Sequence, residues 1–148
     1  MYKKYIDSAT NFYLDRGVDP ITIAGIFGNI SKESGWNPLA NALDNGLGDY
    51  YGLAQMSKDM RKEVKRVYGK VDADTTHQFI YDSMRGSKKI SPAWRSYMKD
   101  NGGYWNNLYD TPEAAAMAFG RVFERPNEKY ADWGERQLSA KDAYDYIM

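Results

Sequence analysis

The sequence predicts a mainly helical α+β domain, and three observations support that fold class. Apolar residues recur at the three- and four-residue spacing of a helix face over most of the chain. Residues that favour helix starts, often followed by proline, precede several of these stretches. Between residues 36 and 55, the helical pattern gives way to glycine, proline and asparagine. Because 148 residues suit one hydrophobic core, residues 1–148 are interpreted as a single domain.

Seven helices are expected along the chain. The first covers roughly residues 3–15, and the second opens with Asp19 and Pro20, a favourable N-cap and first-turn pair. A fourth helix is indicated by apolar residues near residue 80. Capping residues mark the other expected starts: Ser57 for the third helix, Ser91 for the fifth, Thr111 for the sixth and Ser139 for a short last helix.

The segment between the second and third helices predicts a small β-hairpin or irregular insert. Asn45 and Gly46 form a dipeptide that is typical of tight turns. Residues 50–53 have the composition of a short strand. An insert of this kind beside the end of a helix forms a cleft, which is where ligands bind.

Composition excludes several classes of function. Twenty basic and twenty acidic side chains cancel, so no overall field favours nucleic acid or a membrane surface as partner. No cysteine is present, and one histidine with scattered carboxylates predicts no metal site and no cofactor. The N-terminus lacks the apolar run of a signal peptide, and no apolar stretch is long enough to span a membrane.

Glu33 is the most informative residue, because it continues an apolar helix face. Ile23, Ile26 and Ile30 follow a three- and four-residue spacing, and Glu33 is the next position on that face. A carboxyl group there is partly removed from water, which disfavours its charged form, as a general acid near neutral pH requires. The alternative is a structural glutamate that is paired with an arginine.

Other candidate groups follow Glu33 closely in the sequence. Asp44 and Asp49 lie on the turn-rich insert, and Gln55 stands where the chain re-enters a helix. Two carboxyl groups across a cleft, one in apolar surroundings and one in water, divide into an acid and an anion. That division is the chemistry of glycoside cleavage, for which lysozyme is the type example.

Three segments resemble the motifs of the phage tail lysozymes. They run in the family's order over roughly residues 20–130: Gly25-Ile26-Phe27-Gly28-Asn29 leading to Glu33-Ser34 and Asn37-Pro38, then Gly52-Leu53-Ala54-Gln55, then Phe123-Glu124-Arg125-Pro126. The resemblance implies a lysozyme-like fold and makes Glu33 the catalytic acid.

The partner of Glu33 is left open by the sequence. Asp44, in Leu43-Asp44-Asn45-Gly46, is similar to a stretch of some tail lysozymes and is the preferred second carboxylate. Asp49 is the alternative, although it lies one residue from the position used by chicken-type lysozymes, and such a shift reverses a strand side chain. A third possibility is that no second carboxylate takes part, as in transglycosylases.

The resemblance implies a muramidase that cleaves the β-1,4 bond between N-acetylmuramic acid and N-acetylglucosamine in peptidoglycan. Gln55, Tyr51 and Trp36 are the candidate glycan-binding residues. The expected setting is the phage tail or the host cell during lysis, with other tail proteins as further candidate partners. Two alternatives remain: a lytic transglycosylase that forms 1,6-anhydro-muramic products, and an inactive wall-binding or structural tail domain.

Overall fold

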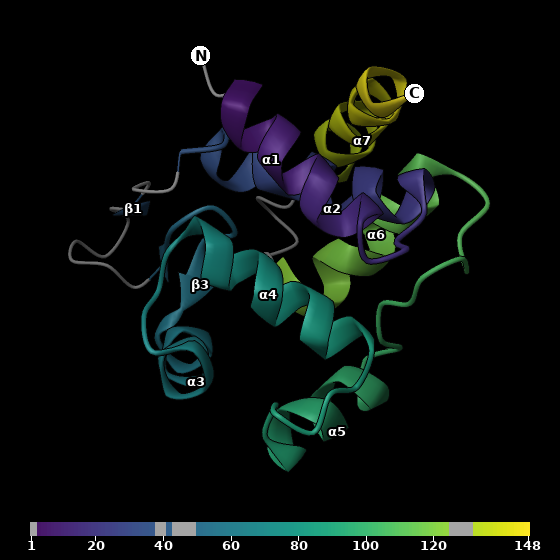
Figure 1. Cartoon of the computed structure of the whole chain (residues 1–148). Helices are drawn as coiled ribbons and strands as arrows, with labels where there is room; N and C mark the ends of the chain where they lie inside the picture. Colours follow the sequence, from purple (N-terminus) through teal and green to yellow (C-terminus); the bar gives the residue numbers. More distant parts are fainter. Residues whose placement is uncertain (1–2, 38–40, 43–49, 125–131) are drawn as a thin grey trace.

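The central helix of the molecule is α2 (Pro20–Ser34), which is buried along most of its length. Figure 1 shows the computed structural model, which describes residues 3–37, 41–42, 50–124 and 132–148. Every residue from Thr22 to Ile30 is buried. The side chain of Asp19 caps the start of α2 by accepting a hydrogen bond from the Thr22 amide. Gly35, in the left-handed conformation with φ 58°, ends the helix.

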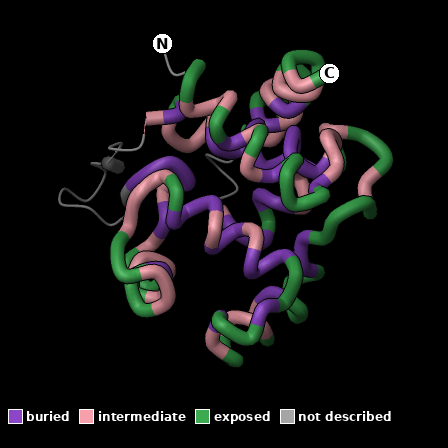
Figure 2. Tube along the Cα trace, in the orientation of Figure 1, coloured by how far each residue is buried: buried purple, intermediate pink, exposed green. Residues whose placement is uncertain are grey.

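The remaining helices form the bulk of the described chain. They are α1 (Lys3–Leu14), α3 (Lys58–Tyr68), α4 (Ala73–Met84), α5 (Pro92–Asp100), α6 (Pro112–Phe119) with its π-helical continuation η1 (Gly120–Glu124), and α7 (Trp133–Ile147). α2 packs chiefly against α7 and α6, whereas α4 contacts both α1 and α3. Buried residues run along α4, which crosses the middle of the view in Figure 2.

A small antiparallel sheet follows α2, as the turn-rich sequence predicted. Its strands are β1 (Asn41–Ala42), β2 (Tyr50–Tyr51) and β3 (Met56–Ser57), in the order β1-β2-β3. β2 pairs with both neighbours, with Tyr51 opposite Met56 in β3. Together with the helices, this sheet confirms the mainly helical α+β, lysozyme-like fold class.

The predicted helix starts agree with the structure except at the C-terminus. Side chains of Ser57, Ser91 and Thr111 cap α3, α5 and α6. The last helix, however, begins at Trp133 with Asp132 as its cap, so Ser139 lies inside α7 and the prediction of a short helix capped by Ser139 was wrong. None of the helices in the described ranges is both long and apolar enough to cross a membrane.

Two glycines of α2 bring its neighbours into direct backbone contact. A Cβ atom on Gly25 would lie 2.6 Å from the carbonyl carbon of Ala115 in α6. A Cβ atom on Gly28 would lie 2.6 Å from the carbonyl oxygen of Arg136 in α7. Backbone atoms cannot yield as a flexible side chain can, so the packing of α2 requires glycine at both positions.

We expect Gly28→Ala to lower the free energy of unfolding by about 1–3 kcal/mol or more, because the added methyl group overpacks the α2–α7 contact. Gly134→Ala is the matched control. It lies in the first turn of α7 with open space around its Cα, so it should leave stability unchanged or raise it by about 0.5–1 kcal/mol. Urea unfolding measures both, and equal effects of the two substitutions would contradict the packing argument.

The buried His77 makes stability depend on pH. Its Nδ1 is 2.9 Å from the Tyr13 hydroxyl, and burial lowers the pKa of His77 from 6.5 to about 4. The unfolded chain therefore binds more protons between these two pH values, and stability is lost as the pH falls from 6.5 towards 4. The full effect is about 3 kcal/mol.

We expect His77→Gln, which keeps a polar partner for Tyr13, to be less sensitive to acid than the parent chain. Unfolding in urea at several pH values measures the difference in stability between the two proteins. That difference should shift in favour of the variant by about 3 kcal/mol on going from pH 7 to pH 4. A difference that is independent of pH would refute the assignment.

Candidate active site

Glu33 ends α2 in contact with an arginine from the opposite end of the chain. Its Oε1 accepts a hydrogen bond of 2.5 Å from Nη2 of Arg136 in α7. The Arg136 side chain is 2% exposed and that of Glu33 is 20% exposed, so the ion pair is largely shielded from water. The arginine partner that the sequence offered as the structural alternative for Glu33 is therefore present.

Asn29 holds this arginine in place from one turn earlier on α2. Nη1 of Arg136 donates to Oδ1 of Asn29 at 2.8 Å. The amide nitrogen of Asn29 donates to the carbonyl oxygens of Gly25 and Ala116, both at 2.9 Å. Both amide N–H groups and the carbonyl oxygen of the buried Asn29 side chain are thus engaged, and they link α2 to α6 and α7. This network orients the guanidinium group towards Glu33.

A second carboxyl group, that of Glu124, lies at the end of η1. The residue is half-buried, but its Oε1 is cut off from water and has no hydrogen-bond partner in the described part of the chain. Burial raises the pKa of Glu124 well above its usual range; repulsion by Glu33 raises it further, and Arg136 opposes the change. The carboxyl groups of Glu33 and Glu124 therefore share one electrostatic environment.

The packing of the two helices explains why these carboxyl groups meet. Gly25 of α2 lies against Ala115 of α6, and one turn later Asn29 lies against Gly120. The two segments therefore run side by side in the same direction, and a further turn brings the chain to Glu33 on one helix and towards Glu124 on the other.

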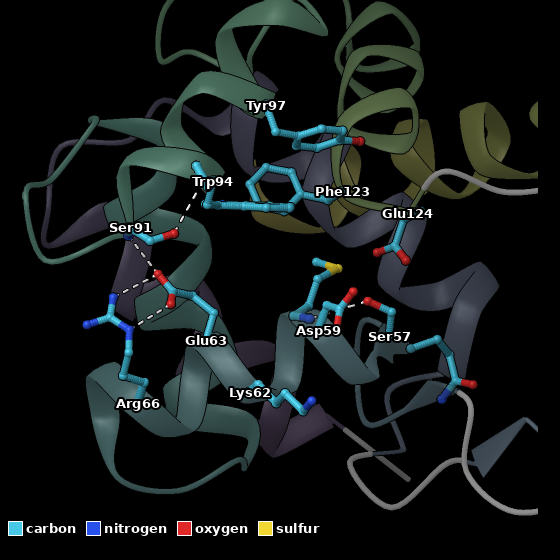
Figure 3. A pocket seen from close by; sticks show the side chains of 13 residues that line it. Ser57, Asp59, Lys62, Glu63, Arg66, Ser91, Trp94, Tyr97, Phe123 and Glu124 are labelled. Atoms are coloured by element: carbon cyan, nitrogen blue, oxygen red, sulfur yellow. Dashed lines mark hydrogen bonds and ion pairs between the residues drawn. The ribbon is translucent and has the colours of Figure 1, made fainter.

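A cleft of about 710 Å³ lies in front of Glu124 (Figure 3). Trp94 and Tyr97 from α5 and Phe123 from η1 form an aromatic wall. The other wall consists of polar and charged side chains, which are Ser57 at the N-cap of α3 and Asp59, Lys62, Glu63 and Arg66 of α3. An aromatic surface facing a polar one suits a sugar chain, whose rings have apolar faces and polar edges.

The aromatic wall is held by hydrogen bonds at its polar edges. Trp94 stacks on Tyr97 with ring centroids 4.9 Å apart. The indole nitrogen of Trp94 donates to the Ser83 hydroxyl at 3.0 Å, and the Tyr97 hydroxyl donates to the carbonyl oxygen of Val122 at 2.8 Å. With these edges occupied, the rings have fixed orientations and present their faces for packing.

Gln55 lines the same cleft as Glu124. It precedes β3 and has a positive φ of 49°, a conformation that non-glycine residues rarely adopt outside sites where the surroundings impose it. Its amide nitrogen donates to the carbonyl oxygen of Gly52 at 2.9 Å. This placement keeps Gln55 as a candidate glycan contact.

The structure places the other candidate residues elsewhere or does not describe them. Trp36 is 6% exposed and packs edge-on against Phe27 in the core, outside the 710 Å³ cleft. Tyr51 lies in β2, where only its backbone is described. Asp44 and Asp49 lie outside the described residues, as do Arg125 and Pro126 of the closing motif. Among the described residues, no three His, Cys, Asp or Glu side chains cluster as metal ligands would.

Comparison with known protein families agrees with the fold and the cleft described above. The model of the phage tail lysozyme family matches residues 4–147, nearly the whole chain. The chain belongs to the phage tail lysozyme family. No curated protein sequence matches it. Membership of this family indicates a peptidoglycan-degrading enzyme of the glycosidase type, and it fits a phage or cell-wall location.

Sequence reasoning missed part of the site of this tail lysozyme. Glu124 stood out only as part of the closing motif, with nothing in the sequence to indicate that it lies near Glu33. Arg136 carried no signal, since it is one of many charged residues in a polar helix. Asn29 could have been found, because it lies four residues before Glu33 and on the same apolar face.

We expect Arg136→Met to lower the free energy of unfolding by about 3–5 kcal/mol, because it leaves Glu33 and the Asn29 carbonyl oxygen without their buried partner. The control is Glu135→Gln, which breaks a 3.8 Å surface ion pair with Lys32 and should cost less than about 1 kcal/mol. Thermal and urea unfolding measure both. Equal stability of the two variants would show that the arginine network is dispensable.

Proposed function

We propose that this enzyme cleaves the β-1,4 bond between N-acetylmuramic acid and N-acetylglucosamine in peptidoglycan, with Glu33 as general acid. The observation that carries the proposal is a cleft with one aromatic and one polar wall that is lined by Glu124, whose carboxyl group is repelled by that of Glu33; Glu33 itself is not among the residues that line this cleft. A sugar-sized cleft with carboxyl groups close by is typical of a glycosidase. Membership of the tail lysozyme family supports the choice of peptidoglycan.

The reaction begins with proton transfer from Glu33 to the glycosidic oxygen. The bond from that oxygen to the anomeric carbon then breaks, and the leaving sugar keeps the proton as a hydroxyl group. Positive charge then develops on the remaining sugar ring. Asp44, or alternatively Asp49, either stabilises this charge or activates the water molecule that attacks the anomeric carbon. Water adds its hydroxyl to the anomeric carbon, and its proton returns to the enzyme.

Glycan binding is assigned to residues around the cleft. Gln55 offers an amide for hydrogen bonds to sugar hydroxyl and acetamido groups, and Tyr51 remains a candidate contact from the adjoining strand. Trp94 and Tyr97 provide apolar surface for the sugar rings. Trp36 is better explained as a core residue, because its indole packs against Phe27.

The proposed setting is the phage tail during entry, where opening the host wall gives DNA a path. Release of progeny late in infection requires the same chemistry and is the alternative setting. Contacts with other tail proteins belong to the first setting and are not needed for the second.

We expect Glu33→Gln to reduce the rate of peptidoglycan solubilisation by about 100-fold or more, because the amide cannot supply the proton. Turbidity loss of purified cell walls measures the rate, and circular dichroism checks that the variant is folded. Glu113→Gln, the same change at the start of α6, is the control and should keep the parent rate. A Glu33→Gln variant that clears walls as fast as the parent would refute the assignment.

Mass spectrometry of the released fragments then separates the two reaction types. We expect reducing-end N-acetylmuramic acid, the product of water addition. Fragments that end in 1,6-anhydro-muramic acid would instead identify a lytic transglycosylase, in which the sugar's own 6-hydroxyl replaces water. Binding of walls without any released fragment would identify a wall-binding domain.

A further inference from the structure

The ion pair between Glu33 and Arg136 raises a chemical difficulty for an acid at this position. A general acid must carry a proton at the working pH. A guanidinium group within hydrogen-bonding distance of a carboxyl group favours loss of that proton. An acid at this position therefore needs a further group that opposes the effect of Arg136.

Glu124 changes this charge balance. Two carboxyl groups and one guanidinium group occupy a region where Arg136 is 2% exposed and Oε1 of Glu124 does not reach water. With both carboxyl groups ionised, the three groups carry a net charge of −1, which is costly where water is excluded. One retained proton restores neutrality.

The helix ends reinforce this preference. Glu33 is in the last turn of α2, and Glu124 is the last residue of η1, which continues α6. The C-terminal end of a helix carries partial negative charge, so an ionised carboxyl group is disfavoured at both positions. The Oε1 atom of Glu124 has no hydrogen-bond donor in the described chain, so nothing there offsets its repulsion of a second negative charge on Glu33.

We propose that Glu124 is a positioning residue for the reaction: Glu33, Glu124 and Arg136 form one charge cluster that retains a single proton, and this proton is the one passed to the glycosidic oxygen. The inference rests on the proposed function and deepens it. Glu124 acts through Glu33, because its negative charge keeps the proton that Arg136 alone would expel. Burial and repulsion by Glu33 both raise the pKa of Glu124, which agrees with a shared proton.

The cluster regains its proton at the end of each catalytic cycle. The cluster loses its proton to the glycosidic oxygen as the bond to the anomeric carbon breaks. It then carries a charge of −1, which stabilises the positive charge that develops on the sugar ring. Addition of water, or of the sugar 6-hydroxyl, at the anomeric carbon releases one proton, which returns to the cluster.

Other charged groups on the surrounding helices are engaged elsewhere or face the cleft. Lys32 of α2 pairs with Glu135 of α7 at 3.8 Å. Asp132 caps α7, and its pKa is lowered chiefly by hydrogen bonds with Glu135, with smaller effects of Lys32 and Arg136. Four charged side chains of α3 line the opposite side of the cleft: Asp59, Lys62, Glu63 and Arg66. Of these, Glu63 and Arg66 are paired with each other at 2.9 Å.

Glu124→Gln tests the proposal through the pH profile of the reaction, measured as kcat and KM on soluble peptidoglycan fragments. Without the second negative charge, the cluster should lose its proton at lower pH. The alkaline limb of the kcat profile should then move down by about one pH unit or more, which lowers kcat about tenfold on that limb. KM should change by less than about twofold, because substrate binding is not the step affected.

Two further variants show whether charge or shape is responsible. Glu124→Asp keeps the charge and should keep the alkaline limb within about 0.5 pH unit of the parent. Glu113→Gln removes the same charge about 16 Å along the helix and should leave the profile unchanged. An alkaline limb of Glu124→Gln that coincides with the parent's, in a folded variant, would overturn the proposal.

Carbon-13 NMR of labelled glutamate carboxyl groups tests the cluster without any activity. At pH 7 the parent should show one proton shared between the carboxyl groups of Glu33 and Glu124. In Glu33→Gln, the Glu124 carboxyl group should titrate at lower pH, because Glu33 no longer repels its negative charge while Arg136 still attracts it. Two fully ionised carboxyl groups at pH 7 in the parent would overturn the shared proton. This outcome is distinct from failure of the proposed function, which appears as undiminished lysis by Glu33→Gln.

Discussion

The guanidinium group of Arg136 is the interaction on which the rest of the site depends. It joins the middle and the end of α2, through Asn29 and Glu33, to a helix more than 100 residues later in the chain. A buried cation is stable only with well-placed hydrogen-bond partners. The contacts of Arg136 with Asn29 and Glu33 therefore help to determine where α7 packs on α2. The position of the candidate acid is therefore a consequence of tertiary packing and not of α2 alone.

Close helix packing makes this arrangement possible. Gly25 and Gly28 allow the backbones of α6 and α7 to touch α2, which shortens the distance that Asn29 and Arg136 must span. The same proximity aligns the C-terminal ends of α2 and η1, where Glu33 and Glu124 lie. The glycines of the family motif thus have a structural role that accounts for their place just before the glutamate.

Local sequence patterns predicted the elements well, and long-range contacts explain what they missed. The apolar stripe of α2, the caps of α3, α5 and α6, and the sheet after α2 all follow from neighbouring residues, and the structure confirms them. The pairing of Glu33 with Arg136 spans 103 residues and leaves no periodic signal. Aromatic residues set a related limit, because they look alike in sequence whether they face a cleft or, like Trp36, are mostly buried.

The π-helical turn at Gly120–Glu124 has a consequence for how this chain can vary. A π-helix adds one residue to the hydrogen-bonded turn, so it shifts the phase of everything that follows by roughly 100° relative to an α-helix. With that shift, Val122 stays in the core while Phe123 and Glu124 line the cleft. Deleting a single residue here would restore the α-helical phase and turn the carboxyl group away. In this segment, the number of residues therefore matters to the site as well as their identity.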